Sequence, residues 1–316
     1  MRAVRFHGYG GLDELRHEEA PDPVIGAGEV LVRVHAAGVN PFDWYSVEGY
    51  VNQYVTFRLP AVLGRDFSGI VEAVGNDAGG FAVGDAVYGQ TDPKGHGTFA
   101  ELTAVEVGRL ARKPAFLSHV EAASLPNVLF AAWDGLFSES SGADLQAGQA
   151  VLVHGAAGGI GSVAVQLARW RGAAVAGTAS GANLRFLREL GVRQAFDYTV
   201  PGWQDGVGSV DAVLDTSGGA MATELCELIR LGGRYVTLRG LPPAAFMAEQ
   251  ADRGVACLAA SGPASLGAFA KMTGLVADGS VKAVVSGVYP IDAVRAALEL
   301  MRGGHVRGKL VLSVKP

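Results

Sequence analysis

The residues with the clearest chemical meaning form a glycine-rich turn near the middle of the chain. The apolar run Val151-Leu152-Val153 leads, through His154, into Gly155-Ala156-Ala157-Gly158-Gly159-Ile160-Gly161. Gly158 would let the backbone approach a pyrophosphate, and Gly161 would let a following helix pack closely on the strand. The N-terminus of that helix would offer free N–H groups and the positive end of its dipole. Although Ala156 replaces the first glycine of the G-x-G-x-x-G pattern, the strand before and the helix after predict a dinucleotide-binding site.

Strand-like and helical patterns alternate around this turn, from about residue 123 to residue 261. The expected strands are 151–154, 174–178, 195–197, 212–215, 235–238 and 255–259. This alternation predicts an α/β fold with a doubly wound parallel sheet of six strands and a cofactor at their carboxyl ends.

The flanking parts of the chain follow a different pattern. Residues 1–122 contain short β-type runs, such as 30–35 and 69–75, separated by Gly and Pro, which is typical of a partly open β-barrel. Helical patterns at about 263–278 and 291–302 precede a closing strand at 309–314. We therefore expect one domain from residues 1–122 and 262–316, and a dinucleotide-binding domain of residues 123–261.

Composition narrows the class of protein. With 316 residues and 49% apolar residues, the chain is long enough to build two cores. A formal net charge of −5 and no basic block argue against a nucleic-acid partner. Cys226 and Cys257 form no C-x-x-C pair, so we interpret them as buried thiols. No apolar signal region or membrane-length span occurs, so the expected location is cytoplasmic, without a membrane partner.

Five short segments occur in an order typical of one family. They are AAGVNPFDW at 36–44, LGRDFSG at 63–69, GDAVYG at 84–89, the glycine turn, and GGHVRGK at 303–309. With these segments, nearly the whole chain resembles the zinc-free quinone oxidoreductase (zeta-crystallin-like) branch of the medium-chain dehydrogenase/reductase superfamily. The resemblance implies a GroES-like first domain, a Rossmann second domain, and a homodimer in which the sixth strands pair edge to edge.

The positions of the family's metal ligands point to the zinc-free branch. The resemblance places Asn40 where zinc enzymes carry a cysteine, and Arg65 and Asp66 where they carry a His-Glu pair. Amides and guanidinium groups are not normal zinc ligands. Residues 90–97 contain no cysteine for a structural zinc lobe, and we interpret His96 as an exposed loop residue. We therefore expect no metal, and an acceptor that delocalises its own charge, such as a quinone or an α,β-unsaturated carbonyl.

The strand after the glycine turn favours NADPH over NADH. NAD-binding folds usually carry Asp or Glu about 20 residues after the turn. This chain has Thr178 there, and Ser180, Asn183 and Arg185 follow within reach of a 2′-phosphate. Many relatives carry a lysine at about position 183, so Arg185 would have to supply the positive charge here.

The resemblance implies further cofactor contacts. Ile160 matches the residue behind the nicotinamide, Asn40 a contact to the nicotinamide ribose, and Tyr198 a tyrosine near the adenosine phosphate. Residues 237–242, which include the unusual Arg239, match a loop whose backbone pairs with the carboxamide. The predicted cofactor-binding residues are Asn40, Ala157, Gly158, Gly159, Ile160, Gly161, Thr178, Ser180, Asn183, Arg185, Tyr198, Arg239, Gly240 and Leu241.

Aromatic residues crowd the segment that follows Asn40. Its predicted pocket residues are Trp44, Tyr45, Tyr50 and Tyr54, and Phe57 follows them. In the family this segment lines the cleft above the nicotinamide, where flat acceptors could stack. The alternative is an ordinary core with a mobile loop. Tyr45 is the candidate for a phenol that orients a carbonyl oxygen.

No side chain is assigned as an essential acid or base. Direct hydride transfer depends mainly on proximity and a water-poor site. Asp43 and Asp66 are therefore interpreted as scaffold residues.

Three functions remain open at this point. The first is an NADPH-dependent quinone oxidoreductase, and the second is an NADPH-dependent enone or enoyl (2-alkenal) reductase. The third, from a different class, is a non-catalytic NADPH-binding sensor or structural protein.

Overall fold

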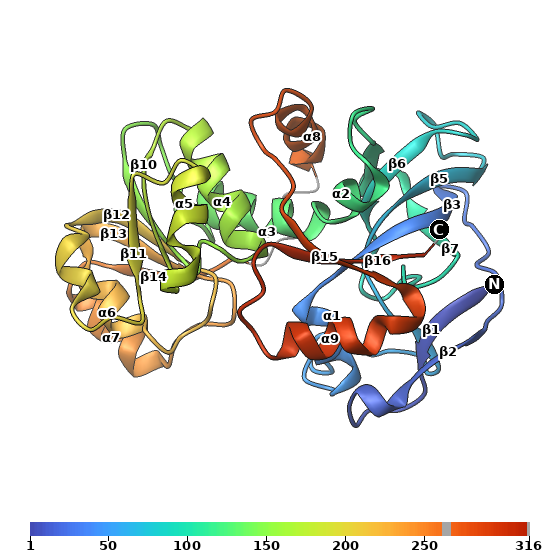
Figure 1. Ribbon diagram of the computed structural model, residues 1–316, viewed down its shortest axis with the longest axis horizontal. Helices are drawn as coiled ribbons and strands as arrows, with labels where there is room; N and C mark the ends of the chain where they lie inside the picture. The colour runs from blue at the N-terminus through green and yellow to red at the C-terminus, as the bar shows by residue number, and fades with distance from the viewer. Residues whose placement is uncertain (261–266, 315–316) are drawn as a thin grey trace. The chain divides into compact units, whose positions relative to one another are not determined.

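The computed structural model describes residues 1–260 and 267–314, and Figure 1 shows the course of the chain. The chain divides into two compact units. The first comprises residues 1–127 with the described residues of 266–274 and 283–316. The second comprises the described residues of 128–265 and 275–282.

The second unit contains the predicted six-stranded sheet. Its strands are β9 (Ala150–His154), β10 (Ala174–Ala179), β11 (Gln194–Asp197), β12 (Val210–Asp215), β13 (Ile229–Thr237) and β14 (Ala256–Ala259). They pair in the order β11-β10-β9-β12-β13-β14, and every pair is parallel. The prediction of a doubly wound parallel sheet is confirmed. The central strands β9 and β12 are recognisable because their faces are buried, and each contains a short apolar run, 150–153 and 212–214.

Helices connect these strands and cover both faces of the sheet. The helices α4 (Gly159–Trp170) and α5 (Leu184–Glu189) lie on one face, and α6 (Ala222–Glu227) and α7 (Ala244–Asp252) on the other (Figure 1). The strand order reverses between β9 and β12, so their carboxyl ends meet at the switch point where such folds bind ligands. His154 and Asp215 pair across these two strand ends. Helix α3 (Pro126–Phe137) precedes β9.

The first unit is built on the long strand β3 (Glu29–Val39). β3 lies in a sheet of order β15-β16-β3-β5-β6-β8 and also pairs with β7. A second sheet has the order β2-β1-β4. The remaining strands of this unit are β1 (Arg2–Phe6), β2 (Leu15–Glu19), β4 (Ala61–Val62), β5 (Asp66–Val74), β6 (Ala86–Gln90), β7 (Leu102–Glu106), β8 (Leu110–Arg112), β15 (Val285–Pro290) and β16 (Lys309–Ser313).

Short helices complete the first unit. They are α1 (Pro41–Val47), α2 (His119–Ala123) and α9 (Val294–Arg302), while α8 (Phe269–Ala277) continues from the first unit into residues of the second. The core of this unit includes Val30, Val32, Val34, Phe67 and Phe99, all nearly inaccessible to solvent. The beginning of the helix that was predicted at 263–278 lies outside the described residues, and the helix that was predicted at 291–302 begins with a 3₁₀ turn, Ile291–Ala293.

Among the described residues, the two compact units differ from the predicted domain boundaries at two places. Residues 123–127 group with the first unit, where Asn127 N donates to Asp66 Oδ1 over 3.1 Å. Residues 275–282 group with the second unit, because Gln166 of α4 exchanges hydrogen bonds of 2.8 and 3.1 Å with the Lys282 backbone. Sequence patterns locate strands and helices but not such side-chain ties.

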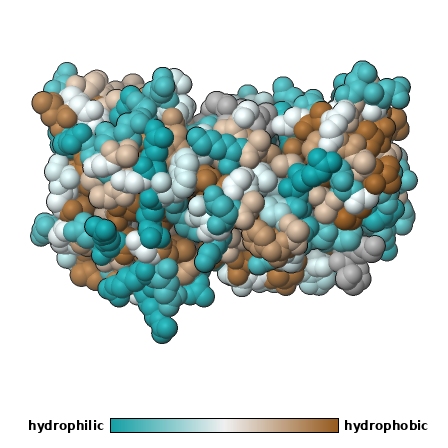
Figure 2. Space-filling model, turned by 90° about the horizontal axis from the view of Figure 1, so that it is seen from above, coloured by the Kyte–Doolittle hydropathy of each residue, from teal (hydrophilic) through white to brown (hydrophobic). Residues whose placement is uncertain are grey.

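The displayed surface is mixed in character. Figure 2 shows hydrophilic residues spread over the visible face, with hydrophobic groups among them. Among the described residues, no helix has the length and apolar character needed to cross a membrane.

Candidate functional site

Two glycines close the turn between β9 and α4. Gly155 has a φ of +75°, and a Cβ there would lie 2.6 Å from Thr216 Oγ1. A Cβ on Gly161 would lie 2.3 Å from the Gly155 carbonyl oxygen, so the helix can approach the turn only without a side chain. Sequence reasoning assigned Gly161 to close packing but missed Gly155. The signal was a glycine placed directly after the strand.

The N-terminus of α4 presents backbone donors without a side-chain cap. Gly158 is the N-cap residue, and no side chain caps the helix. Gly158, Gly159 and Ile160 are half-buried, while Ala157 is 7% exposed. The amides of the first turn have no partner within the helix, and the dipole of this 12-residue helix favours an anion there. These residues fit the pyrophosphate of a dinucleotide.

Thr178 is buried against the turn. It is 0% exposed, and its Oγ1 accepts a 3.2 Å hydrogen bond from Gly155 N. The same hydroxyl shares a 2.7 Å hydrogen bond with His154 Nδ1, and burial lowers the pKa of His154. Besides its predicted place beside the cofactor, Thr178 therefore stabilises the glycine turn through its hydroxyl.

The other residues predicted near the 2′-phosphate follow the ends of β10 and β11. Asn183 Nδ2 donates to Ser180 Oγ over 3.2 Å, and both residues are half-buried. The Tyr198 amide donates to the Ala179 carbonyl over 3.3 Å. Arg185 is on α5 with its side chain 90% exposed, and its Nε donates to Glu189 over 2.9 Å. The structure thus brings Ser180 and Asn183 together and pairs Arg185 with an acid.

Asp215, at the end of β12, organises the next loop. Its Oδ1 accepts from the amides of Ser217 and Gly218 and from the Ser217 hydroxyl, over 2.9 to 3.1 Å. Its Oδ2 accepts from Gly219 N over 3.1 Å and from the Tyr235 phenol over 2.7 Å. Burial acts to raise the pKa of Asp215, but these hydrogen bonds outweigh it and hold the pKa below its usual range. Sequence reasoning missed this residue, although an acid before Thr-Ser-Gly-Gly at a strand end was visible.

The predicted residues Arg239, Gly240 and Leu241 lie in the exposed loop after β13. Arg239 N donates to Thr237 Oγ1 over 3.2 Å, and Gly240 has a φ of +84°. Leu241 is 53% exposed. The loop therefore has its backbone on the surface, as a contact to a ligand through main-chain atoms requires.

In the first unit, Asn40 lies in a buried network of polar side chains. It is 2% exposed and forms the N-cap of α1, and its backbone N donates to Asp43 Oδ2 over 2.7 Å. Its Nδ2 donates to Asp66 Oδ2 over 2.9 Å. Asp66 Oδ1 accepts from Gln90 Nε2 over 2.9 Å as well as from Asn127 N. Hydrogen bonds thus partner both carboxylate oxygens of Asp66.

Four ionisable groups meet in this network. Asp43, Asp66 and Lys309 are buried, and Arg65 is half-buried. Burial raises the pKa of Asp43 to about 7 and also raises the pKa of Asp66. Burial lowers the pKa of Lys309 and of Arg65. The two acids and two bases balance in number, so pairing offsets part of their desolvation.

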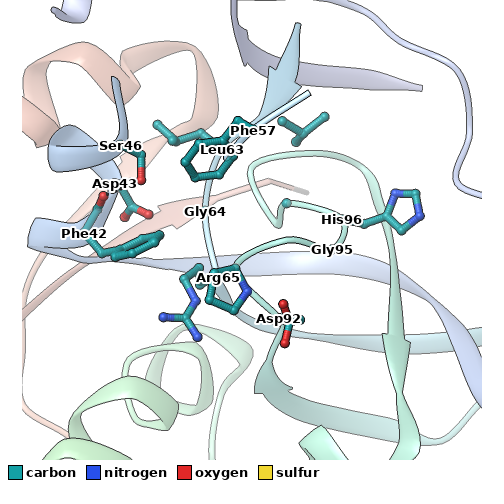
Figure 3. A pocket seen from close by; sticks show the side chains of 13 residues that line it. Phe42, Asp43, Ser46, Phe57, Leu63, Gly64, Arg65, Asp92, Gly95 and His96 are labelled. Carbon is teal, nitrogen blue, oxygen red and sulfur yellow. Dashed lines mark hydrogen bonds between the residues drawn. The ribbon is translucent and has the colours of Figure 1, made fainter. Parts of the chain in front are cut away.

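A small pocket lies beside this network within the first unit. Figure 3 shows Phe42 and Asp43 at one side of it and His96 at the other. Asp43 Oδ1 and Arg65 Nε are buried without a hydrogen-bond partner among the described residues, and both residues line this pocket. His96 is exposed, in agreement with its interpretation as a loop residue. The pocket therefore combines charged and apolar side chains.

The residues at the family's metal positions do not fit a zinc site. Lys309 Nζ lies 2.6 Å from Asn40 Oδ1 and 3.8 Å from Asp66 Oδ2, so a side-chain cation already faces both. Within residues 1–260 and 267–314, no group of three or more His, Cys, Asp or Glu residues could hold a metal ion. Arg65 adds a second positive charge, which a metal cation would repel.

The aromatic residues after Asn40 form a partly exposed cluster. The rings of Trp44 and Tyr45 are 4.0 Å apart, and Tyr50 contacts both edge-on at 6.1 and 6.0 Å. Tyr50 is 62% exposed and Tyr54 is 74% exposed, while Phe57 packs against the core. The structure brings Trp44, Tyr45 and Tyr50 together, and their exposed faces can stack on a flat molecule.

Comparisons with known proteins agree with this architecture. Residues 26–115 match the family described as alcohol dehydrogenase GroES-like domain, and residues 190–312 match zinc-binding dehydrogenase. The whole chain is 33% identical to the 2-methylene-furan-3-one reductase of Solanum lycopersicum, of which it covers 80%. It is also 33% identical, over 99% of its length, to the chloroplastic NADPH-dependent alkenal/one oxidoreductase of Arabidopsis thaliana, of which it covers 79%. The solved quinone oxidoreductase of Coxiella burnetii has a TM-score of 0.87 and 28% identity, and the match covers 100% of this chain and 99% of that one.

Proposed function

Because the chain belongs to the medium-chain dehydrogenase/reductase superfamily, as an oxidoreductase of its quinone oxidoreductase branch, we propose that it transfers a hydride from NADPH to a quinone without zinc. One observation carries the proposal. The positions that hold a catalytic metal in zinc enzymes of the superfamily are filled here by Asn40, Arg65 and Asp66, with the Lys309 ammonium against them. A quinone spreads the charge that it receives, so it needs a Lewis acid less than an alcohol or aldehyde does.

The cofactor assignment combines backbone and side-chain features. The first turn of α4 would hold the pyrophosphate, and bound NADPH would supply the hydride. Ser180, Asn183 and Arg185 would bind the 2′-phosphate, since Thr178 stands where NAD-binding folds usually carry a carboxylate. Asn40 would contact the nicotinamide ribose. The remaining predicted contacts, from Tyr198 and the loop with Arg239, Gly240 and Leu241, stay part of the same proposal.

An α,β-unsaturated carbonyl is the second candidate acceptor. Two relatives that are 33% identical carry names that specify a 2-methylene-furan-3-one and an alkenal or enone. Quinones and enones are both flat and conjugated, so the cluster of Trp44, Tyr45 and Tyr50 could stack on either.

One screen separates these possibilities. NADPH oxidation is followed spectroscopically over a panel of quinones, enals and enones, and the products are analysed by mass spectrometry after reaction with deuterated NADPH. Reduction of quinones supports the leading proposal, and deuterium on the β-carbon of an enone supports the second. Stoichiometric NADPH binding without turnover of any acceptor would instead support a sensor or structural protein.

Two further proposals concern the state of the protein. We infer a homodimer through the edge strand β14, and a cytoplasmic location. The first has a structural basis, because β14 is the last strand of its sheet. The second rests on the sequence alone.

A further inference from the structure

The ammonium group of Lys309 is enclosed in the first unit. Its side chain is 5% exposed, and it is the first residue of β16. β16 runs antiparallel to β3, with Leu310 opposite Val39, so Lys309 lies beside Asn40 at the end of β3. Nζ donates to the Val39 carbonyl and to Asn40 Oδ1, both over 2.6 Å. Strand pairing therefore delivers a positive charge to Asn40.

The chemistry of its two neighbours fixes the Asn40 amide in one orientation. Its Oδ1 accepts from Lys309, and its Nδ2 donates to Asp66 Oδ2. An ammonium can only donate, and an ionised carboxylate can only accept. Turning the amide over would place its NH₂ against the ammonium and its oxygen against the carboxylate. Lys309 and Asp66 thus select the same orientation from opposite sides.

Asp43 and Arg65 are the other charged groups at this place. Asp43 holds the backbone of Asn40, and the Arg65 guanidinium lies 5.0 Å from the ring of Phe42, next to Asp43 in the sequence. Asn40 therefore has its backbone and both ends of its amide held. An apolar residue of similar size often stabilises a fold as well as a buried charged group does. Stability alone therefore does not explain why an ammonium group is buried at this position.

We infer that Lys309 is a positioning residue, whose ammonium orients the Asn40 amide for its contact with the nicotinamide cofactor. The inference rests on the proposed function, because it takes the contact between Asn40 and the cofactor from there. Lys309 occupies one acceptor site of Oδ1, while Nδ2 donates to Asp66 Oδ2 and, over 3.5 Å, to the Gly38 carbonyl. Asn40 therefore keeps a second acceptor site on Oδ1, in a defined place, for a ribose hydroxyl. An amide free to turn over would present its NH₂ group there instead.

A double-mutant cycle on the full-length protein tests the inference. The variants are Lys309→Met, Asn40→Ala and the combination of the two, and the readout is the NADPH dissociation constant. Lys309→Met should weaken NADPH binding roughly tenfold, as expected for a hydrogen bond to a charged group. In the Asn40→Ala background the same change should alter binding by less than about twofold, because the residue through which Lys309 acts is gone.

Two more variants separate positioning from support of the fold. Lys309→Arg keeps a charged donor and should recover most of the affinity. Tyr88→Phe removes a different buried hydrogen bond of this unit, from the phenol to Thr273 at 2.8 Å, and should leave NADPH binding unchanged. If Lys309→Met does not fold by circular dichroism, Lys309→Gln replaces it in the cycle, because its amide keeps a polar group beside Asp66.

The outcomes are distinguishable. Independent, multiplying effects of the Lys309 and Asn40 changes, or no effect of Lys309→Met, would overturn the inference. If the wild-type protein binds NADPH but reduces no acceptor, the proposed function fails while the cycle still decides the role of Lys309. A wild-type protein that binds neither NADPH nor NADH would overturn both.

Discussion

The Tyr235 phenol donates a 2.7 Å hydrogen bond to Asp215 Oδ2, and this contact ties β13 to the end of β12. Burial and the neighbouring carboxylate raise the pKa of Tyr235, so the phenol stays a donor. Since Asp215 also accepts from the three residues that follow Thr216, one buried carboxylate holds both a strand and a loop.

Asp215→Asn should therefore lower the free energy of unfolding by about 2–4 kcal/mol, because its NH₂ group would face donors on whichever side it lies. Tyr235→Phe should cost only about 1–2 kcal/mol, since it removes a single hydrogen bond. Denaturant unfolding of both variants measures the difference. If both variants lose the same free energy of unfolding, the hydrogen bonds from the loop amides to Asp215 add nothing to stability.

Arg185→Ala should weaken NADPH by about 1.5 kcal/mol and leave NADH unchanged. This lies at the lower end of the range for a charged hydrogen bond, because the exposed Arg185 must leave Glu189 to meet the phosphate. Arg193→Ala is the control. This exposed arginine precedes β11, so it lies at the amino end of that strand, whereas the predicted phosphate site lies at the carboxyl ends of β10 and β11. Dissociation constants for both cofactors decide the matter. A parallel loss for NADH would assign Arg185 to another role, and a wild-type preference for NADH would remove the NADPH proposal.

Stability should fall between pH 6.5 and pH 4 because of His119. Burial, with His35 and Lys113 nearby, lowers the pKa of His119 from 6.5 to about 4. The folded state binds this proton more weakly than the unfolded state, so the contribution is complete above pH 6.5 and is lost as the pH falls towards 4. Since the ring is only half-buried, we expect a loss of about 1–2 kcal/mol.

His119→Asn provides the test of that pH dependence. Its amide can replace Nδ1 as the donor to Ser68 Oγ, a contact of 2.8 Å, without titrating in this range. Unfolding free energies at several pH values should show a flatter profile for the variant. The same slope in both proteins would assign the acid sensitivity to other groups.

The purified protein should contain far less than one zinc per chain, and treatment with a chelator should not change its activity. Asn40 and Arg65 supply no normal zinc ligand, and Lys309 places a positive charge against the remaining carboxylate, Asp66. Elemental analysis and assays before and after chelation are the measurements. Zinc at one per chain, with activity that depends on it, would contradict this prediction.

The protein should be a dimer at micromolar concentration, because an edge strand such as β14 can pair with a second copy. Ala256→Lys, at an exposed residue of β14, should shift the population towards monomers by placing like charges in the interface. Val24→Lys, at an 86% exposed residue of the first unit, is the matched control. Light scattering of the three proteins gives the result, and a monomeric wild type would exclude the dimer.

The second unit illustrates what a sequence can reveal about a fold. Its central strands contain short apolar runs, 150–153 in β9 and 212–214 in β12, so both strands were located to within two residues. The glycine turn was recognisable because its chemistry depends on backbone shape, which glycine spacing records. The parallel order followed from the alternation of strands and helices.

The side-chain networks were less accessible to sequence reasoning. Lys309 was visible as the last residue of GGHVRGK, but nothing in the sequence placed it against Asn40, 269 residues away. The prediction for Thr178 depended only on the absence of a carboxylate at this position, whereas the structure shows its hydroxyl hydrogen-bonded to Gly155 N and His154 Nδ1. Such partnerships depend on strand register and on the path of each side chain, which local patterns do not encode.

The separation of Asn40 from Lys309 also affects how the chain can fold during its synthesis. All six strands of the nucleotide-binding sheet lie between these two residues and are complete by Ala259. Asn40 and Asp66 are synthesised early, and their partner Lys309 is added only when β16 is made. With synthesis at about 5–20 residues per second, this delay lasts on the order of ten seconds or more. Over that interval, the half-made first unit has two acids, Asp43 and Asp66, and only the Arg65 guanidinium to balance them, so the sheet of the second unit can form before the charge network closes.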